Sequence, residues 1–345
     1  MKAIVLHESG PAENLHLEDV AVPSLTVGHA LVRVHAAGVC YRDIIDRRGG
    51  FPFAKRPVVP GHEFAGVVES VASDVEDVSV GDRVANLHRS SCGECEYCLA
   101  GHAPRCARSP FFFGLTADGG YAEYVLAPAG SLVRLPVDVP FEHGCFLACT
   151  AGVALRGLRT HAELKEGETV LVTGASGGVG LHGMQVAKAL GAHVVAVTSS
   201  AAKADFLRSH GADDVLVSGD FAFHKEVQRR TGGVHVALDC VGAPTLNASI
   251  RSVRPMGRVV IAGNVTTERF EVNPGYAILN EVSLLGSSGC TRADLLDVFR
   301  WTQQGTLKPV VAGVFSLAQA ADAHRQLEGK AVTGRLVLRP GQSPQ

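Results

Sequence analysis

Residues 170–191 read VLVTGASGGVGLHGMQVAKALG and decide the fold. An apolar strand pattern leads into a cluster of glycines, and a helix-like segment follows. Glycines at such a turn let the backbone approach a pyrophosphate at the helix N-terminus. Because strand and helix both flank the turn, dinucleotide binding is favoured over glycines that only tighten it. The residues predicted to bind the cofactor here are Gly174, Gly177, Gly178, Val179 and Gly180.

Around this turn, short apolar runs alternate with helix-like segments. The runs 193–198 (HVVAVT), 236–240 (VALDC) and 258–263 (RVVIAG) are apolar nearly throughout. Strand and helix in alternation indicate a parallel sheet, and strands without polar positions indicate that helices cover both faces. The sequence therefore predicts an α/β fold with a doubly wound parallel sheet.

The two ends of the chain differ from this middle part. Residues 1–150 contain brief strands of alternating polarity, separated by Gly and Pro, and indicate a β-rich domain. Residues 289–345 contain two helix-like segments and a terminal strand. We expect 289–345 to complete the domain that 1–150 begins, with 151–288 as the dinucleotide-binding domain.

Composition excludes several partners. The chain has 345 residues, 46% of them hydrophobic, and a formal charge of −2. That balance supports a large core and offers no general attraction for nucleic acid or an anionic membrane. No apolar stretch of about 18 residues appears. Nine cysteines, after a start MKAIVLHE that lacks a secretory signal, predict a cytoplasmic protein with reduced thiols.

The strand at 193–198 predicts the cofactor type. An NAD-selective fold carries Asp or Glu at its end, where this chain has Ser199, Ser200 and, further on, Lys203. Small hydroxyl residues and a cation favour a 2′-phosphate, so we expect NADP(H) over NAD(H). For Lys203 taken alone, a solvated lysine on a helix is the alternative.

Four cysteines lie in SCGECEYCLAGHAPRC at 91–106. Their intervals of two, two and seven residues let four thiolates converge on one ion. Four sulfurs close the coordination sphere of tetrahedral zinc, which indicates a structural site in a lobe at about 88–110. An iron–sulfur cluster is the alternative, although the spacing matches no usual ferredoxin pattern. The predicted ligands are Cys92, Cys95, Cys98 and Cys106.

A second set is scattered: Cys40, His62 with Glu63, and Cys149. Taken alone, a Cys or His beside apolar residues is more often a packed core residue than a metal ligand. Their joint occurrence, with Cys149 directly before the dinucleotide fold, carries the prediction of a site.

These motifs resemble the zinc-containing medium-chain dehydrogenase/reductase superfamily, in particular its alcohol dehydrogenases. The resemblance rests on GHEFAGVV (61–68), GDRV (81–84), the four cysteines and the glycine turn, in family order. It implies a GroES-like catalytic domain with an inserted Rossmann domain, and two zinc ions per chain. It also implies Cys40, His62 and Cys149 as ligands of the catalytic zinc.

The resemblance assigns further roles. Glu63 follows the ligand histidine and can approach the metal, and Asp43 would orient His62 through its other ring nitrogen. An ordinary turn residue is the alternative for Asp43. Cys145 is the rival for the third ligand position. The apolar strand at 282–288 (VSLLGSS) suggests a homodimer or homotetramer.

Two positions depart from the alcohol dehydrogenase pattern. Arg42 and Ile45 stand where those enzymes usually carry a proton relay of Ser or Thr and His. His88 lies where the family often has an aromatic pocket wall. It is a candidate acid or base near neutral pH, with a polar pocket wall as the alternative.

The sequence leaves three candidate functions for this protein. The first is reversible hydride transfer between NADP(H) and an alcohol/carbonyl pair, with zinc as Lewis acid. The second is reduction of an activated C=C bond, because CYRDII (40–45) also resembles a branch that includes acryloyl-CoA reductases. A non-catalytic nucleotide-binding protein is the third, against which the full set of metal ligands argues.

Overall fold

The computed structural model describes residues 1–109, 111–266 and 268–341. The chain divides into two units. The first contains Met1–Cys149, Gly289–Gln303 and the residues from Val310 onward, and the second contains Thr150–Ser288 and Gln304–Pro309.

The second unit is built on a parallel sheet. Its strand order is β10-β9-β8-β11-β12-β13, and all neighbours run parallel. Counted from β8, this is the 3-2-1-4-5-6 order of dinucleotide-binding folds, which confirms the predicted fold class. The strands are β8 (Thr169–Val172), β9 (His193–Thr198), β10 (Asp214–Val217), β11 (Val234–Asp239), β12 (Val253–Ile261) and β13 (Ser283–Gly286).

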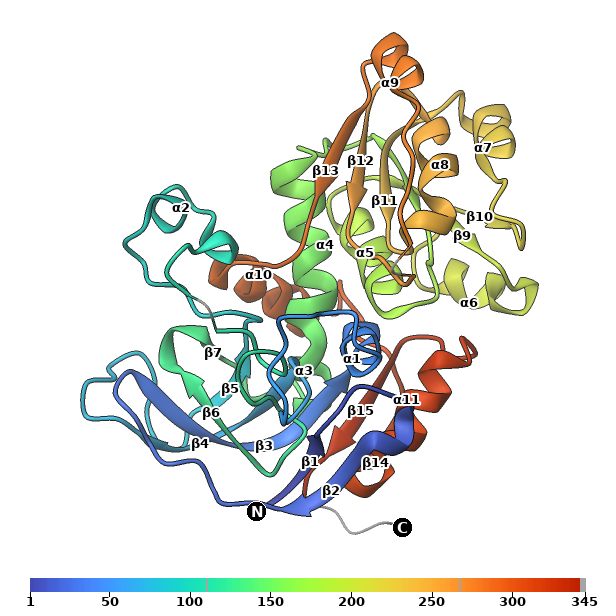
Figure 1. The fold of residues 1–345 in the computed structure, drawn as a ribbon. Coiled ribbons are helices and arrows are strands. Elements are labelled where there is room, and N and C mark those ends of the chain that lie inside the picture. The colour runs from blue at the N-terminus through green and yellow to red at the C-terminus, as the bar shows by residue number, and fades with distance from the viewer. Residues whose placement is uncertain (110, 267, 342–345) are drawn as a thin grey trace. The chain divides into compact units, whose positions relative to one another are not determined.

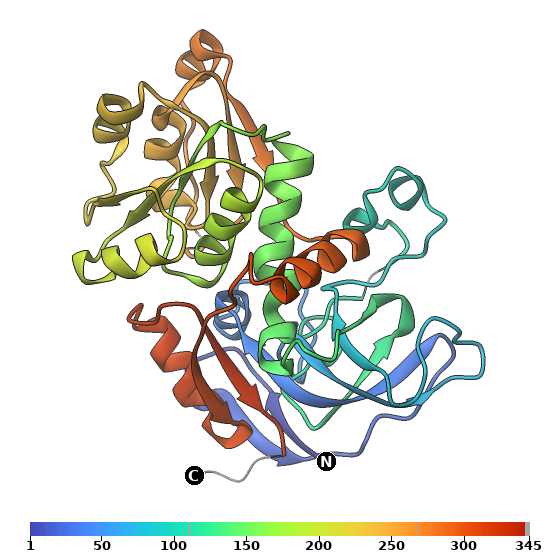
Figure 2. The same cartoon turned by 180° about the vertical axis from the view of Figure 1, so that it is seen from behind.

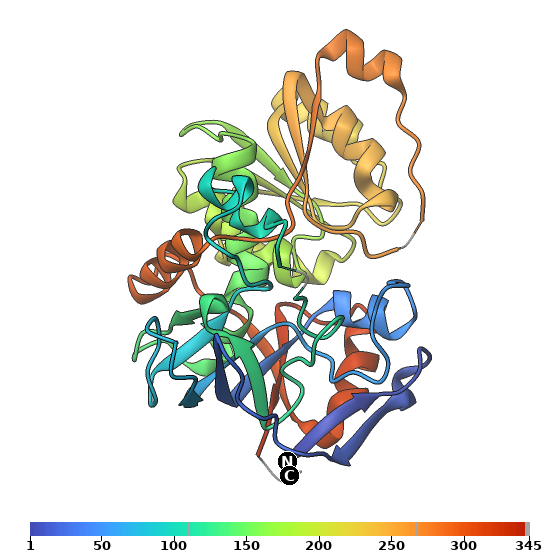
Figure 3. The same cartoon turned by 60° about the vertical axis from the view of Figure 1, so that its left-hand side comes forward.

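Helices cover both faces of this sheet (Figures 1 and 3). Central strand residues such as Val170, Leu171 and Val236 are fully buried, as near-continuous apolar strands require. The helices are α4 (Val153–Leu155), α5 (Gly178–Ala189), α6 (Ala204–Ser209), α7 (His224–Thr231), α8 (Ala243–Ser252) and α9 (Pro274–Asn280), with a π-helical segment at Arg156–His161 and a 3-10 turn at Ala201–Lys203.

The first unit is built on mainly antiparallel strands. The sheet order is β14-β15-β3-β4-β5-β7, β6 also pairs with β3, and β14 runs parallel to β15. In Figure 2 the red C-terminal strands lie in the same unit as the blue N-terminal ones. The strands are β1 (Lys2–Leu6), β2 (Leu15–Asp19), β3 (His29–Val39), β4 (Phe64–Val71), β5 (Arg83–Asn86), β6 (Tyr124–Pro128), β7 (Leu132–Arg134), β14 (Val311–Ser316) and β15 (Arg335–Arg339).

Short helices close this unit around a core of Val, Ala, Leu and Phe side chains. They are α1 (Tyr41–Arg47), α2 (Glu96–Leu99), α3 (Phe141–Leu147), α10 (Arg292–Gln303) and α11 (Ala320–Glu328). Short 3-10 turns lie at Ala12–Asn14, Ala103–Arg105, Ala129–Ser131 and Leu317–Gln319, and a π-helical segment at Ala148–Gly152 follows α3.

The two units differ from the expected domain division at Thr150, which lies in the second unit, and at one further segment. Gln304–Pro309 belongs to the second unit, whereas the sequence placed it in the first. The Gln185 side chain of α5 binds this segment: its amide donates to the Lys308 carbonyl at 3.1 Å and accepts from the Lys308 N–H at 2.7 Å. Pro110 of the expected zinc lobe and residues 342–345 of the expected first domain lie outside the described residues.

Across the described residues, no helix combines the length and the apolar character that crossing a membrane requires.

Candidate active site and metal centres

Two adjacent strand ends bring Cys40 and His62 together. Cys40 follows β3 directly and precedes α1, and His62 and Glu63 directly precede β4. β3 and β4 pair antiparallel, and the Gly38 N–H donates to the Glu63 carbonyl at 2.9 Å. The end of one strand therefore lies beside the start of the other.

Cys149 completes the cluster from the π-helical segment after α3. Its Sγ lies 3.4 Å from Nε2 of His62. The candidate ligand atoms of Cys40, His62, Glu63 and Cys149 all lie within 4.8 Å of one another. Cys145, the rival in the sequence, is buried in α3 with its thiol 3.5 Å from the Glu142 carbonyl, and it is outside this group.

The electrostatics of the thiols suit a metal. A hydrogen bond from Cys149 lowers the pKa of the Cys40 thiol well below its usual value, against burial, and Arg335 and His62 act in the same direction. The same hydrogen bond and burial raise the pKa of Cys149. The pair thus favours one thiolate, the form that binds metal ions. Two thiols and an imidazole are a ligand set that zinc takes in catalytic sites, so these residues fit it.

Asp43 forms a hydrogen bond with the ring nitrogen of His62 that does not face Cys149. Nδ1 of His62 lies 2.8 Å from Oδ1 of Asp43, and both residues are buried. Burial and Arg42 lower the pKa of His62, but the charges of Asp43 and Cys40 outweigh them and raise it to about 9. A proton on Nδ1 that is held by Asp43 leaves Nε2 facing Cys149, the arrangement usual for metal-binding histidines.

Glu63 has a cationic partner that the sequence did not indicate. Arg335 of β15 forms a buried ion pair with it. Burial raises the pKa of Glu63 to about 7, although the Arg335 charge opposes the rise.

His88 follows β5, and its ring centroid is 5.4 Å from that of His62. Burial, then the charges of His62 and Arg42, lower its pKa to about 3. The ring is therefore neutral near pH 7. A neutral ring does not favour the role of an acid near neutral pH, whereas the base role and the polar pocket wall stay predictions.

Arg42 occupies the position of the missing relay. Its Nη2 donates to the Phe113 carbonyl at 2.6 Å and lies 3.7 Å from Oδ1 of Asp43. Its side chain is 22% exposed. A guanidinium stays protonated in proteins, so Arg42 presents a fixed positive charge and accepts no proton.

The four-cysteine lobe forms a second, separate cluster. Distances between sulfurs are 3.5 Å for Cys95 and Cys98, 3.9 Å for Cys95 and Cys106, and 4.0 Å for Cys92 and Cys98. Backbone N–H groups of Cys95 and Cys92 donate to the sulfurs of Cys92 and Cys106 at 3.3 and 3.4 Å. The four sulfurs fit a closed tetrahedral zinc site.

The glycine turn lies at the carboxyl end of β8. Gly174 has φ +56°, in the left-handed region, and a Cβ on Gly180 would lie 2.3 Å from the Gly174 carbonyl oxygen. Only glycine permits this close approach of turn and helix start. Gly177 precedes α5, which begins at Gly178 and includes Val179.

The neighbouring strand end presents the predicted selectivity residues. β9 lies beside β8, and the Ala175 N–H of the turn donates to the Val197 carbonyl of β9 at 3.2 Å. Ser199 and Ser200 follow β9, and Lys203 ends the 3-10 turn after them. Burial lowers the pKa of Lys203. The predicted cofactor residues therefore all follow the carboxyl ends of the neighbouring strands β8 and β9.

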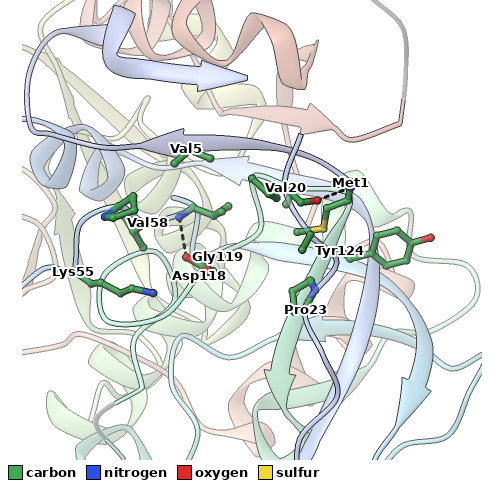
Figure 4. Close-up of a pocket in the computed structure, with 13 residues that line it drawn as sticks. Met1, Val5, Val20, Pro23, Lys55, Val58, Asp118, Gly119 and Tyr124 are labelled. Carbon is green, nitrogen blue, oxygen red and sulfur yellow. Dashed lines mark hydrogen bonds between the residues drawn. The ribbon is translucent and has the colours of Figure 1, made fainter. Parts of the chain in front are cut away.

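A cavity of about 220 Å³ in the first unit is a different feature (Figure 4). Lys55, Asp118 and Tyr124 are among its lining residues, and the Asp118 carboxylate accepts the Val59 N–H at 3.0 Å. Among the described residues that line it, none is a predicted site residue.

A dinucleotide-type sheet and a thiol–imidazole cluster define a class of metal-containing dehydrogenases. Comparison with known families agrees. Residues 26–137 match the alcohol dehydrogenase GroES-like domain, and residues 178–304 match the zinc-binding dehydrogenase domain. The chain belongs to the zinc-containing medium-chain dehydrogenase/reductase superfamily, and it is an oxidoreductase.

Relatives span the full chain. An acryloyl-coenzyme A reductase of Sulfurisphaera tokodaii is 37% identical and covers 99% of this chain and 100% of its own. An alcohol dehydrogenase of Geobacillus stearothermophilus is 34% identical, with 98% and 99% covered. The crystal structure of AibC superposes with a TM-score of 0.93 at 44% identity, covering 99% and 96%.

Proposed function

We propose that this protein reduces the C=C bond of an α,β-unsaturated carbonyl compound, such as an enoyl thioester, with NADPH. The observation that carries the proposal is Arg42, whose guanidinium stands where alcohol dehydrogenases begin their proton relay. Two full-length relatives at 37% identity, from Sulfurisphaera tokodaii and Metallosphaera sedula, are acryloyl-coenzyme A reductases, which supports the same reading.

The charge requirements of the two reactions differ. Alcohol oxidation must pass a proton to an acceptor, and Arg42 is not one. Hydride addition to an enoyl β-carbon instead leaves negative charge on the carbonyl oxygen, until a proton reaches the α-carbon. A fixed positive charge stabilises that charge where it develops. The Arg42 charge helps to lower the pKa of His88 and opposes the rise in the pKa of His62, so it is felt at both rings of this site.

Cofactor and metal supply the remaining chemistry when bound: the nicotinamide provides the hydride, and zinc provides a Lewis acid. The chain's own residues set the geometry. Cys40, His62 and Cys149 would hold the metal, Asp43 orients the His62 ring, and Phe113 fixes Arg42 through its carbonyl.

Reduction of a plain carbonyl is the second candidate. The complete thiol–imidazole cluster favours it, because the alcohol route depends on a metal-held substrate oxygen. One assay separates the two functions: NADPH is offered with crotonyl-CoA or with butanal, and the products are identified by mass spectrometry. Butyryl-CoA formation supports the proposal, whereas reduction of butanal alone contradicts it.

We also infer a preference for NADP(H). Ser199 and Ser200 leave space for a 2′-phosphate, and Lys203 adds a cation at the same edge. Comparison of kcat/KM for NADPH and NADH tests this inference. Lys203→Ala should reduce the preference about tenfold, the effect of losing a charged hydrogen bond. Equal efficiency with both cofactors in the wild type would contradict it.

The assembly proposed from the sequence has a matching surface. β13 is the edge of the parallel sheet, and Ile278 and Leu279 of the preceding helix are 73% and 85% exposed. An apolar sheet edge can pair with the same edge of a second copy of the chain. We therefore propose a homodimer that forms through β13, or a tetramer made of two such dimers. Light scattering of the wild type and of Leu279→Glu tests this interface.

A further inference from the structure

A hydrogen-bonded row of buried side chains extends from His62 away from the thiols. Beyond Asp43, the Tyr121 hydroxyl lies 3.4 Å from Oδ2 of Asp43, and Nε2 of His324 lies 3.2 Å from that hydroxyl. Tyr121 and His324 are fully buried. Tyr121 lies three residues before β6, and His324 belongs to α11. Neither residue has a role in the function proposed above.

Packing holds the tyrosine ring against the backbone that carries His62. Gly61 has φ +94°, and a Cβ on it would lie 2.3 Å from Cδ1 of Tyr121. The Tyr121 N–H also donates to the Pro60 carbonyl at 3.0 Å. On its other side, the ring meets His324 edge to face, with centroids 5.8 Å apart. The hydroxyl is therefore fixed in position, and only the direction of its hydrogen is open.

The hydrogen-bond donors and acceptors around the Tyr121 hydroxyl determine the direction of its hydrogen. The backbone N–H of Cys40 can only donate, and it lies 3.2 Å from Oδ2 of Asp43, so this oxygen is an acceptor. The single hydroxyl hydrogen of Tyr121 therefore points to Asp43, which leaves the hydroxyl oxygen to accept from His324. Burial lowers the pKa of His324 to about 4, so the ring is neutral and has one N–H.

The tautomer of His324 follows. With its hydrogen on Nε2, the ring donates to Tyr121, and Nδ1 is a lone pair. Nδ1 has no hydrogen-bond partner among the described residues. The other tautomer would bury an unpaired N–H at Nδ1, and Nε2 of His324 and Oδ2 of Asp43 would then compete for the single hydroxyl hydrogen of Tyr121.

We propose that Tyr121 is a positioning residue for the Asp43–His62 pair, and that His324, as its Nε2–H tautomer, directs the Tyr121 hydroxyl toward Asp43. Donors then reach both carboxylate oxygens, and Asp43 is held in the orientation that fixes the His62 ring. This inference rests on the proposed role of His62 as a zinc ligand. Its effect is on retention of the metal rather than on substrate.

The test follows metal release rather than turnover. Zinc-loaded protein is mixed with an excess of a chelating dye, and zinc release is timed for the wild type, Tyr121→Phe, and Tyr124→Phe as the matched control. Outer partners of metal-binding histidines are worth about 10–100-fold in metal affinity. We expect Tyr121→Phe to release the zinc of the Cys40 cluster about tenfold faster, and Tyr124→Phe to match the wild type.

The role of His324 is tested in the same assay. Gln carries an N–H donor and Leu does not, so His324→Leu should release zinc faster than His324→Gln. Because His324 acts through the hydroxyl, Tyr121→Phe combined with His324→Leu should release zinc no faster than Tyr121→Phe alone. Unfolding midpoints of each variant check that the fold is kept.

Two results would overturn the proposal in distinguishable ways. Wild-type release rates in Tyr121→Phe, with zinc bound at both clusters, would remove the positioning role and leave the ligand assignment intact. Zinc at the four-cysteine lobe alone, in the wild type, would contradict the ligand assignment and the positioning role together.

Discussion

Arg42 and Phe113 are joined by a 2.6 Å hydrogen bond from guanidinium Nη2 to carbonyl oxygen, across 71 residues of sequence. The bond fixes a positive charge 3.7 Å from the carboxylate that supports His62. An immobile cation costs no reorganisation when negative charge develops nearby. This relationship separates the site from that of an alcohol dehydrogenase with a hydroxyl relay.

Replacing Arg42 with Ser should therefore impair C=C reduction. Loss of one fixed stabilising group costs about 100-fold in kcat, and the variant should keep its affinity for NADPH. Steady-state kinetics with crotonyl-CoA and cofactor fluorescence titration measure the two effects. Arg33→Ser, at a half-exposed arginine on β3, is the control and should behave as the wild type. A fully active Arg42→Ser protein would remove Arg42 from the mechanism.

Loss of Arg335 alone should destabilise the protein more than loss of both members of the buried Glu63–Arg335 pair. Arg335→Met leaves the Glu63 carboxylate buried without its cation, a change worth about 3–5 kcal/mol in the free energy of unfolding. Adding Glu63→Gln removes the stranded charge and should restore part of that loss. Urea denaturation at neutral pH of the wild type, the single variant and the double variant measures both. Equal stability of all three would contradict the pairing.

The four-cysteine lobe should bind zinc independently of the other cluster. We expect the wild type to hold about two zinc ions per chain and Cys95→Ser to hold about one. Elemental analysis of the purified proteins gives these values. Since Cys240 is partly buried and lies outside both clusters, Cys240→Ser is the matched control and should keep both ions. An unchanged zinc content in Cys95→Ser would contradict the lobe assignment.

The ionised Glu168 carboxylate should stabilise the folded protein, and this contribution should be lost in acid. Burial favours the protonated form, but the Lys165 N–H and Arg258 outweigh it and lower the pKa of Glu168 below 4.5. A depressed pKa in the folded state adds stability above the unfolded value, and that contribution is lost as pH falls through the folded value. Glu168→Gln should therefore be less stable than the wild type at pH 6, with the difference shrinking toward pH 3. Glu166→Gln, at an exposed position, should show no such trend.

Local patterns predicted the sheet and the four-cysteine lobe, because spacing within a short segment carries their information. The glycine turn and the apolar strands each lie within a short stretch of sequence, so they indicate a parallel sheet without any knowledge of distant contacts. The place of Gln304–Pro309 was missed for the opposite reason. Its contacts are with residues far away in the sequence, among them Gln185, whose side chain binds a backbone 123 residues away.

The candidate active site was predictable only in part. Cys145 and Cys149 are four residues apart and share a helix face, so sequence leaves both open until the structure brings Cys149 to His62. Arg335 and His324 come from the C-terminal segment, 272 and 203 residues from their partners. No local pattern marks a buried counter-ion or a hydrogen-bond partner at such separations.

The position of a transferred deuterium distinguishes C=C reduction from C=O reduction within a single substrate. NADPH that carries deuterium at the transferable C4 position is incubated with the protein and crotonaldehyde, which offers a C=C and a C=O bond in one molecule. For C=C reduction we expect butanal with deuterium on the carbon β to the carbonyl, detected by NMR. Crotyl alcohol with deuterium on the carbinol carbon would contradict it.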